Sequence, residues 1–217
     1  MNGKMHIPDG FLNVPTAAAA GIASIGCIRT AVKRTRAAFE EKQAPIMGMM
    51  AAFIFAAQMI NFPVAGGTSG HLIGAMLAAV TLGPWAAVLI MSSIVIIQAF
   101  FFADGGILVL GANILNMAVI GNFAGYYIYK LFKTDGNSIS KTGIIIGCWI
   151  SVVAAALAAS FEIAAAGNIG LMVVLPPMLF WHAIIGIGEG VITLCAVEFI
   201  FKARGDLVKG VGVNAEK

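Results

Sequence analysis

Charged residues are scarce in this 217-residue chain. Asp, Glu, Lys and Arg make up 11% of it and hydrophobic residues 60%, whereas a soluble domain usually carries about 25% charged residues. The mean hydropathy is +0.95. This shortage excludes a surface that meets water over most of its area, and it predicts an all-α, polytopic membrane protein. The net charge of +3 is confined to short stretches, so the chain lacks the continuous basic face that nucleic-acid binding needs.

The chain also lacks the motifs of several enzyme classes. It has no Gly-x-x-x-x-Gly-Lys-Ser/Thr sequence, so we do not expect it to hydrolyse ATP. It has no His-Glu-x-x-His sequence, and its three histidines are widely spaced, which argues against an intramembrane metalloenzyme. The three cysteines, Cys27, Cys148 and Cys195, form no Cys-x-x-Cys pair and lie in apolar runs. They are predicted to be packing residues rather than disulfide or metal-thiolate partners.

The remaining sequence divides into seven apolar segments separated by polar or glycine- and proline-rich stretches. A helix needs about 20 residues to cross a hydrocarbon core of about 30 Å. The segment 71–82 is too short to do so as a straight helix, so it is either a half-membrane segment or a span whose ends are buried in protein. We expect residues 61–70 to form a turn and 167–177 to form a loop. The predicted spans are 14–30, 46–60, 71–82, 85–102, 112–132, 142–166 and 178–201.

The basic residues predict the orientation of these spans. With the N-terminus outside and the C-terminus inside, twelve of the thirteen Lys and Arg residues lie on the inner side, and only Lys4 lies outside. The reverse orientation would violate the positive-inside rule. No cleavable signal peptide is expected, because the basic residues follow the first apolar segment. We predict one integral membrane domain over 1–217, with a cytoplasmic tail at 202–217, in the plasma membrane of a prokaryote.

Small residues recur at the spacing of helix–helix contacts. Gly121 and Gly125 are four residues apart, as are Gly186 and Gly190. Small residues at this spacing let helix backbones approach closely in lipid. Packing inside the bundle and docking of a partner membrane subunit are both consistent with the pattern.

Two of the three histidines lie in segments that this topology brings to the outer side. His6 lies in the N-terminal stretch, and His71 follows a glycine-rich turn and opens the short segment 71–82. Imidazole is a ligand for nickel, cobalt, copper and zinc, and polar groups within a membrane protein usually serve a function. His182, beside Trp181 at the start of the last span, is instead interpreted as an interfacial or hydrogen-bonding residue.

His6 is preceded by a methionine from which translation could start. If the chain begins at Met5, its amine has a pKa of about 7.7 to 8 and readily loses its proton to a metal. The Met5 amine, the His6 main-chain nitrogen and the His6 imidazole would then chelate an ion, and His71 would supply a fourth nitrogen. A planar set of four nitrogens favours nickel(II) or copper(II). If residues 1–4 stay attached, an amide nitrogen of Lys4 or Met5 is the alternative. We take Met5 as the working N-terminus.

Three motifs extend this interpretation. Met-His-Ile-Pro-Asp-Gly-Phe-Leu at 5–12, Ser-Gly-His-Leu-Ile-Gly-Ala at 69–75 and Leu-Gly-Ala-Asn-Ile-Leu-Asn-Met at 110–117 resemble motifs of the CbiM/NikM family. These proteins are the metal-specificity subunits of energy-coupling factor (ECF) transporters. The resemblance covers residues 5 to about 201. It implies seven helices, with the extracellular N-terminus (residues 1–13) plugged into the bundle.

The same resemblance implies a site and partners. The metal ligands would be Met5, His6 and His71, with Ser69, Asn113 and Asn116 as candidates for supporting hydrogen bonds. The partners would be an ATP-binding subunit, a transmembrane coupling subunit and often a small auxiliary membrane subunit.

The predicted function is therefore high-affinity binding of Ni²⁺ or Co²⁺ and presentation of the ion for ATP-driven uptake. The alternative is a stand-alone secondary metal transporter driven by an ion gradient, in which Glu162, Glu189 and Glu198 relay protons. Glu162 and Glu189 could equally be buried partners of asparagine or backbone groups, and Glu198 lies near the inner interface. A vitamin would need a larger pocket with aromatic residues for stacking.

Overall fold

The structure is a computed structural model, and it describes residues 6–37, 43–64, 68–132 and 139–204. Within these ranges the chain is mostly helical, and four helices are long and apolar enough to cross a membrane: α1 (Val14–Ala37), α4 (Pro84–Phe101), α7 (Lys141–Ala165) and α8 (Leu171–Arg204). The chain is therefore a multi-pass membrane protein, as predicted. The total of seven crossings remains a prediction.

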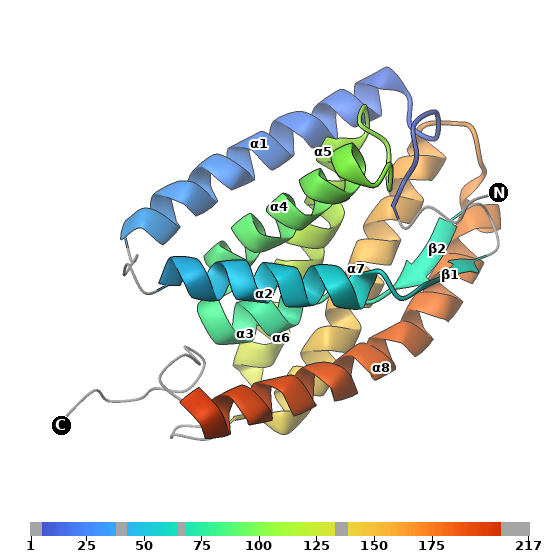
Figure 1. The fold of residues 1–217 in the computed structure, drawn as a ribbon. Helices are drawn as coiled ribbons and strands as arrows, with labels where there is room; N and C mark the ends of the chain where they lie inside the picture. The colour runs from blue at the N-terminus through green and yellow to red at the C-terminus, as the bar shows by residue number, and fades with distance from the viewer. Residues whose placement is uncertain (1–5, 38–42, 65–67, 133–138, 205–217) are drawn as a thin grey trace.

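The other elements complete a bundle in which successive helices run back and forth (Figure 1). Helix α2 (Gln43–Gln58) leads into a hairpin of β1 (Asn61–Val64) and β2 (Thr68–His71), which is followed by the short helix α3 (Ala75–Leu82). After α4 comes an unbroken helical run of α5 (Leu110–Ile114), the π-helical segment η1 (Leu115–Gly121) and α6 (Asn122–Leu131). The hairpin and the N-terminal segment lie at the same end of the bundle.

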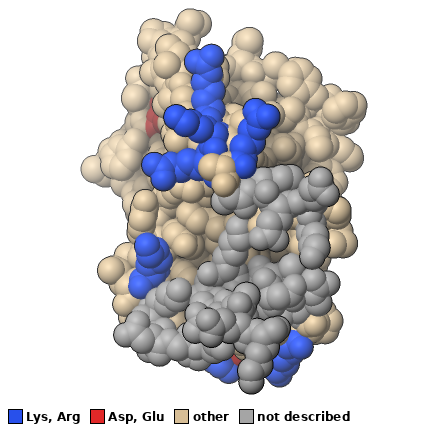
Figure 2. Space-filling view, turned by 90° about the vertical axis from the view of Figure 1, so that its left-hand side faces the viewer, with Lys and Arg blue, Asp and Glu red and all other residues tan. Residues whose placement is uncertain are grey.

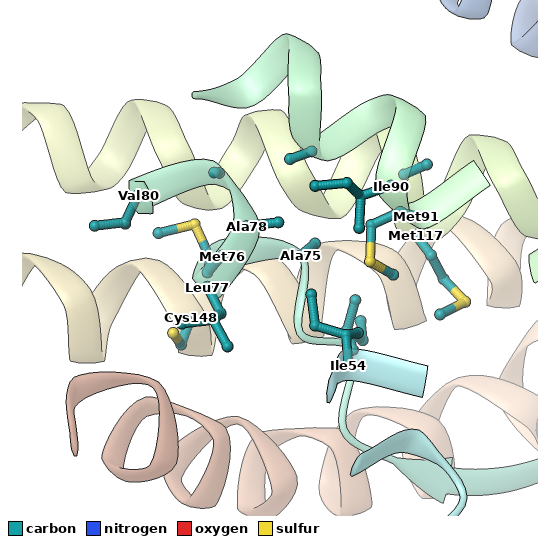
Figure 3. Close-up of a cluster of buried hydrophobic side chains, with 14 of the residues drawn as sticks. Ile54, Ala75, Met76, Leu77, Ala78, Val80, Ile90, Met91, Met117 and Cys148 are labelled. Atoms are coloured by element: carbon teal, nitrogen blue, oxygen red, sulfur yellow. The ribbon is translucent and has the colours of Figure 1, made fainter. Parts of the chain in front are cut away.

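Helix α3 lies at the centre of the core. All eight of its residues are buried, so its backbone meets other helices instead of lipid. Figure 3 shows its side chains packed with Ile54, Met91, Met117 and Cys148. The structure therefore shows a short segment enclosed by protein, and its assignment as a half-membrane segment or a full crossing stays a prediction. Cys148 is buried in this core, as a packing residue would be, whereas Cys27 is partly buried and Cys195 is exposed.

Two predicted boundaries are wrong. His71 does not open a helix: it ends strand β2 opposite Asn61, and the helix begins at Ala75 after Gly74, which has a φ of 77°. The glycine-rich stretch folds back as a hairpin and not as a simple turn. The loop predicted at 167–177 is also mostly helix, because α8 begins at Leu171 and contains Pro176 and Pro177. Proline removes a backbone hydrogen bond, but this loss is tolerated in membrane helices whose neighbours satisfy the freed groups.

The glycine pairs lie at helix contacts, which confirms their interpretation as packing positions. A Cβ on Gly121 would lie 2.9 Å from the Ser151 carbonyl oxygen of α7. A Cβ on Gly186 would lie 3.1 Å from the Cα of Trp149. The first distance is too short for a Cβ and the second is tighter than most Cβ contacts, so glycine lets α7 pack closely against its neighbours.

The described Lys and Arg residues gather at one end of the bundle, away from the hairpin (Figure 2). They come from the end of α1, the end of α6, the start of α7 and the end of α8: Arg29, Lys33, Arg34, Arg36, Lys130, Lys141 and Lys202. This segregation is the pattern that the positive-inside rule describes. The prediction that this end faces the cytoplasm accords with it and remains a prediction.

Candidate metal centre

The N-terminal segment 6–13 is docked on the loop and helix start at 105–113. The Ile7 amide donates to Asn113 Oδ1 at 3.0 Å, and Asn113 Nδ2 donates back to the Ile7 carbonyl at 3.1 Å. The Gly106 amide also donates to the Ile7 carbonyl, at 2.9 Å. The side chains of Ile7 and Leu12 are buried in a small apolar cluster. This pairing carries the neighbouring residue, His6, into the bundle.

Asp9 secures the same segment from the solvent side. Its carboxylate accepts hydrogen bonds from the amides of Ile107 at 3.1 Å and Leu108 at 2.9 Å. A Cβ on Gly106 would overlap Asp9, so only glycine fits there. Asn13 then starts α1, because its side chain accepts a hydrogen bond from the Thr16 amide at 3.0 Å, as N-cap residues do.

The structure brings His6 and His71 together although they are 65 positions apart. Their ring centroids are 5.0 Å apart and the rings meet at 82°. Only 5% of His6 and 7% of His71 is exposed. The docked segment supplies one ring, and strand β2 supplies the other.

Both imidazoles are neutral, and His71 has a defined free nitrogen. Burial lowers the pKa of His6 to about 4 and, together with the nearby His6, lowers the pKa of His71 to about 3. His71 Nδ1 donates to the Leu72 carbonyl at 2.8 Å. Since a carbonyl oxygen only accepts, the proton is on Nδ1 and the Nε2 lone pair of His71 is available. A neutral imidazole with an available lone pair is the form that binds a metal.

The two rings face a cavity of about 60 Å³. Its polar lining comes from His6, His71, Asn113, Asn116 and His182. Cavities that hold organic ligands usually measure about 300 Å³ or more. This cavity therefore has room for an ion and does not suit a vitamin.

His182 is a hydrogen-bonding residue, as one of the two sequence interpretations predicted. It is buried, lines the cavity with the other two histidines, and its Nδ1 donates to the Met178 carbonyl at 2.7 Å. It is therefore not an interfacial residue. The signal that could have revealed it is its position at the outer start of the last predicted span, on the same side as His6 and His71.

The remaining predicted site residues are Asn116, Ser69 and Met5. Asn116 lines the cavity and donates through Nδ2 to Glu162 at 2.7 Å, while its buried Oδ1 has no partner within the described ranges. Ser69 lies in β2 opposite Pro63, and its contribution to the site stays a prediction. Met5 lies outside the described residues. Among the described residues, no cluster of three or more His, Cys, Asp or Glu side chains could hold a metal, so the proposed ligand set depends on main-chain nitrogens.

The three glutamates considered as proton carriers have local partners. Glu189 accepts hydrogen bonds from the amides of Ile73 at 2.6 Å and Gly74 at 3.0 Å. Glu162 accepts from Asn116, and Glu198 pairs with Lys141 at 2.6 Å. These contacts match the structural alternative for Glu162 and Glu189, and the inner-interface position of Glu198 stays a prediction.

A protein family and several known proteins are similar to this chain. Residues 6–207 match the family model CbiM, described as the cobalt uptake substrate-specific transmembrane region. A protein of Archaeoglobus fulgidus, provisionally named as the fused nickel transport protein NikMN, is 42% identical over 94% of the chain and 68% of its own length. A crystal structure of a truncated transition metal transporter has a TM-score of 0.85 and 40% identity, covering 92% of this chain and 99% of that one. The S component of a bacterial ECF transporter shares the fold, with a TM-score of 0.51 and 20% identity over 78% of this chain and 99% of that one.

Proposed function

The chain belongs to the CbiM family of cobalt uptake substrate-specific transmembrane regions, and from this premise we propose that it binds one Ni²⁺ or Co²⁺ ion at His6 and His71. It is a component of metal-ion transport and not an enzyme. In the proposed role it presents the ion for ATP-driven uptake as the substrate-specificity subunit of an ECF-type transporter.

The observation that carries the proposal is the contact between His6 and His71 at 5.0 Å between ring centroids. Both rings are buried and neutral, and they border a cavity of ionic size. The proposed ligands are the Met5 nitrogen, the His6 main-chain nitrogen, the His6 imidazole and His71 Nε2. Four nitrogens in a plane favour nickel(II) over cobalt(II), so nickel is the first candidate. Asn113 and Asn116 would support the ligands through hydrogen bonds.

The proposed partners are an ATP-binding subunit, a transmembrane coupling subunit and a small auxiliary membrane subunit. The fold shared with an ECF S component supports this assignment. In a prokaryotic plasma membrane, the end that carries His6 would face outward and the basic end of Figure 2 would face the cytoplasm.

The competing function is a stand-alone transporter driven by an ion gradient. The hydrogen bonds of Glu162 and Glu189 within the bundle make them less suited to carry protons.

Isothermal titration with NiCl₂ and CoCl₂ tests the site in protein purified with Met5 as its first residue. We expect one ion per chain, and we expect His6→Ala and His71→Ala each to abolish stoichiometric binding while the protein stays folded. The control is His182→Ala, which changes a histidine of the same cavity that is outside the proposed ligand set and should retain one ion per chain. Unchanged binding in the His6 or His71 variant would reject the site. Metal uptake by this chain alone in proteoliposomes, driven by a proton gradient, would favour the competing function.

A further inference from the structure

His6 begins a continuous chain of buried hydrogen bonds that ends on the main chain near His71. His6 Nε2 lies 2.8 Å from Gln98 Oε1, Gln98 Nε2 donates to Gln58 Oε1 at 2.8 Å, and Gln58 Nε2 donates to the Ile73 carbonyl at 2.6 Å. Gln98 belongs to α4 and Gln58 to α2. Neither glutamine has measurable solvent exposure. No partner from water competes for these amides, so their mutual hydrogen bonds determine which way each one points.

The direction of this chain is set at its last member. The Ile73 carbonyl can only accept, so the Gln58 atom that faces it must be the nitrogen. The Gln58 oxygen then faces Gln98 and requires the Gln98 nitrogen, which turns the Gln98 oxygen toward His6. An oxygen at that place requires a proton on His6 Nε2. The two glutamines therefore select the Nε2–H tautomer of His6, and its lone pair is on Nδ1.

This tautomer is the one that an amino-terminal chelate needs. Nδ1 of a histidine and the main-chain nitrogen of the same residue close a six-membered ring with a metal ion. Nε2, on the far side of the ring, cannot reach an ion bound to that main-chain nitrogen. With Nδ1 protonated, His6 would have no free nitrogen toward the ion and would present its lone pair to Gln98 instead.

The same chain connects the two segments that carry histidines. Ile73 is two residues after His71, and its amide is held by Glu189 of α8 at 2.6 Å. The Gly74 amide, which belongs to the same peptide unit as the Ile73 carbonyl, donates to the other oxygen of Glu189 at 3.0 Å, so this peptide is held through both its carbonyl and its amide. A displacement of Gln58 or Gln98 would disturb the orientation of the His6 ring and the hydrogen bonding next to His71 together.

We propose that Gln58 and Gln98 are positioning residues for metal binding, and that their hydrogen-bond chain holds His6 as the Nε2–H tautomer with Nδ1 free. The proposal rests on the proposed function for its purpose, because a metal ligand is what the selected lone pair would serve. Neither glutamine touches the ion in this arrangement. Partners of this kind, which orient a histidine ligand, typically contribute about 10- to 100-fold to metal affinity.

Nitrogen NMR of metal-free protein labelled with ¹⁵N-histidine tests the tautomer directly. The chain has only three histidines, so single substitutions at His71 and His182 assign their signals. We expect a protonated, pyrrole-type Nε2 and an unprotonated, pyridine-type Nδ1 for His6. A protonated Nδ1 in the metal-free protein would overturn the proposal. This measurement uses no metal, so its result stands even if the chain binds neither nickel nor cobalt and the proposed function fails.

Nickel titration of four variants, Gln58→Leu, Gln98→Glu, Gln98→Leu and Ser92→Ala, tests the positioning role. Gln58→Leu leaves the Gln98 amide free to rotate, and although it removes no atom in contact with His6, we expect nickel affinity to fall by at least about 10-fold and the His6 spectrum to show both tautomers. Gln98→Glu in its protonated form keeps an acceptor oxygen toward His6 and a hydroxyl donor toward Gln58, so its nickel affinity should stay close to that of wild type. The matched control is Ser92→Ala on α4, since Ser92 Oγ is buried without a partner in the described ranges, and it should stay within about threefold of wild type.

The outcomes separate a positioning role from a merely structural one. Loss of affinity in Gln58→Leu, with His71 still protonated on Nδ1 and with Gln98→Glu close to wild type, would support the proposal. Equal affinities of Gln58→Leu and Ser92→Ala would overturn it. Loss of affinity in Gln98→Glu as large as in Gln98→Leu would overturn it too, because an acceptor at position 98 would then have no effect. If Gln58→Leu does not fold, the nickel affinities of Gln98→Glu and Gln98→Leu decide. Equal affinities of these two variants would overturn the proposal.

Discussion

Asn113→Leu is the substitution that should separate docking of the N-terminal segment from stability of the bundle. Leucine is close to asparagine in size but can neither donate nor accept a hydrogen bond. The Ile7 amide would lose its 3.0 Å hydrogen bond and would have no replacement among the described residues, while the Ile7 carbonyl would keep the bond from Gly106 at 2.9 Å. A buried amide without a partner costs about 1–3 kcal/mol, and the second lost bond adds about 1 kcal/mol.

This loss of about 3 kcal/mol destabilises only the docked state of residues 6–13. Metal binding needs that state, so the apparent dissociation constant for nickel should rise by up to about 100-fold, according to how strongly docking is favoured beforehand. Competition titration against a metallochromic indicator measures the constant. Hydrogen exchange of residues 6–13, followed by mass spectrometry, should show faster exchange in the variant.

The matched control is Asn122→Leu. Asn122 is a buried asparagine of α6 that donates to the carbonyls of Pro84 at 2.9 Å and Ala118 at 3.1 Å, and it does not line the cavity of the histidines. We expect it to lower the thermal midpoint without changing nickel affinity. If Asn113→Leu binds nickel as tightly as wild type, or if the two variants lose affinity equally, the docking argument is refuted.

Two further predictions concern protons. Since both imidazoles are neutral at pH 7, the protons released on nickel binding should come from main-chain nitrogens: about two at pH 7, falling to about one at pH 9 if the Met5 amine is free, because that amine has a pKa of about 7.7 to 8. Titration calorimetry in buffers of different ionisation enthalpy counts them; a count of two at both pH values would indicate an amide at Met5, and a count of three at pH 7 would show that an imidazole was charged. The second prediction is acid sensitivity of the metal-free protein. Burial lowers the pKa of His6 from its ordinary value of 6.5 to about 4 in the folded protein. As the pH falls, the unfolded chain therefore binds the proton at a higher pH than the folded protein does. The stability that the neutral ring contributes is complete above pH 6.5 and declines as the pH falls toward 4, by about 2 kcal/mol at pH 5. Thermal midpoints at pH 7 and pH 5 should therefore differ less in His6→Asn than in wild type, and an equal difference would contradict the assignment.

The sequence predicted the parts of this molecule that depend on composition and order along the chain. The low charge content and the apolar segments predicted a helical, multi-pass membrane protein. The positions of His6 and His71 relative to the spans placed both on one side of the bundle, and the structure puts their rings in contact. The glycine pairs predicted close helix contacts because their spacing is a property of the helix itself.

What the sequence did not predict depends on contacts between distant segments. The pairing of β1 with β2 joins residues on either side of a glycine-rich stretch, and α8 continues through Pro176 and Pro177, which usually end or kink a helix. Gln58 and Gln98 are unremarkable in their own helices, and only the packing of α2 on α4 joins them to His6. His182 enters the cavity because of the rotation of α8 about its axis, which no local pattern specifies.

Anomalous diffraction at the nickel absorption edge, from crystals of protein that begins at Met5, tests the central claim most directly. The account predicts one nickel peak per chain, located between His6 Nδ1 and His71 Nε2, with the first residues of the chain completing a planar set of nitrogens. A nickel peak elsewhere in the bundle, or one bound through His182 without His6, would contradict it.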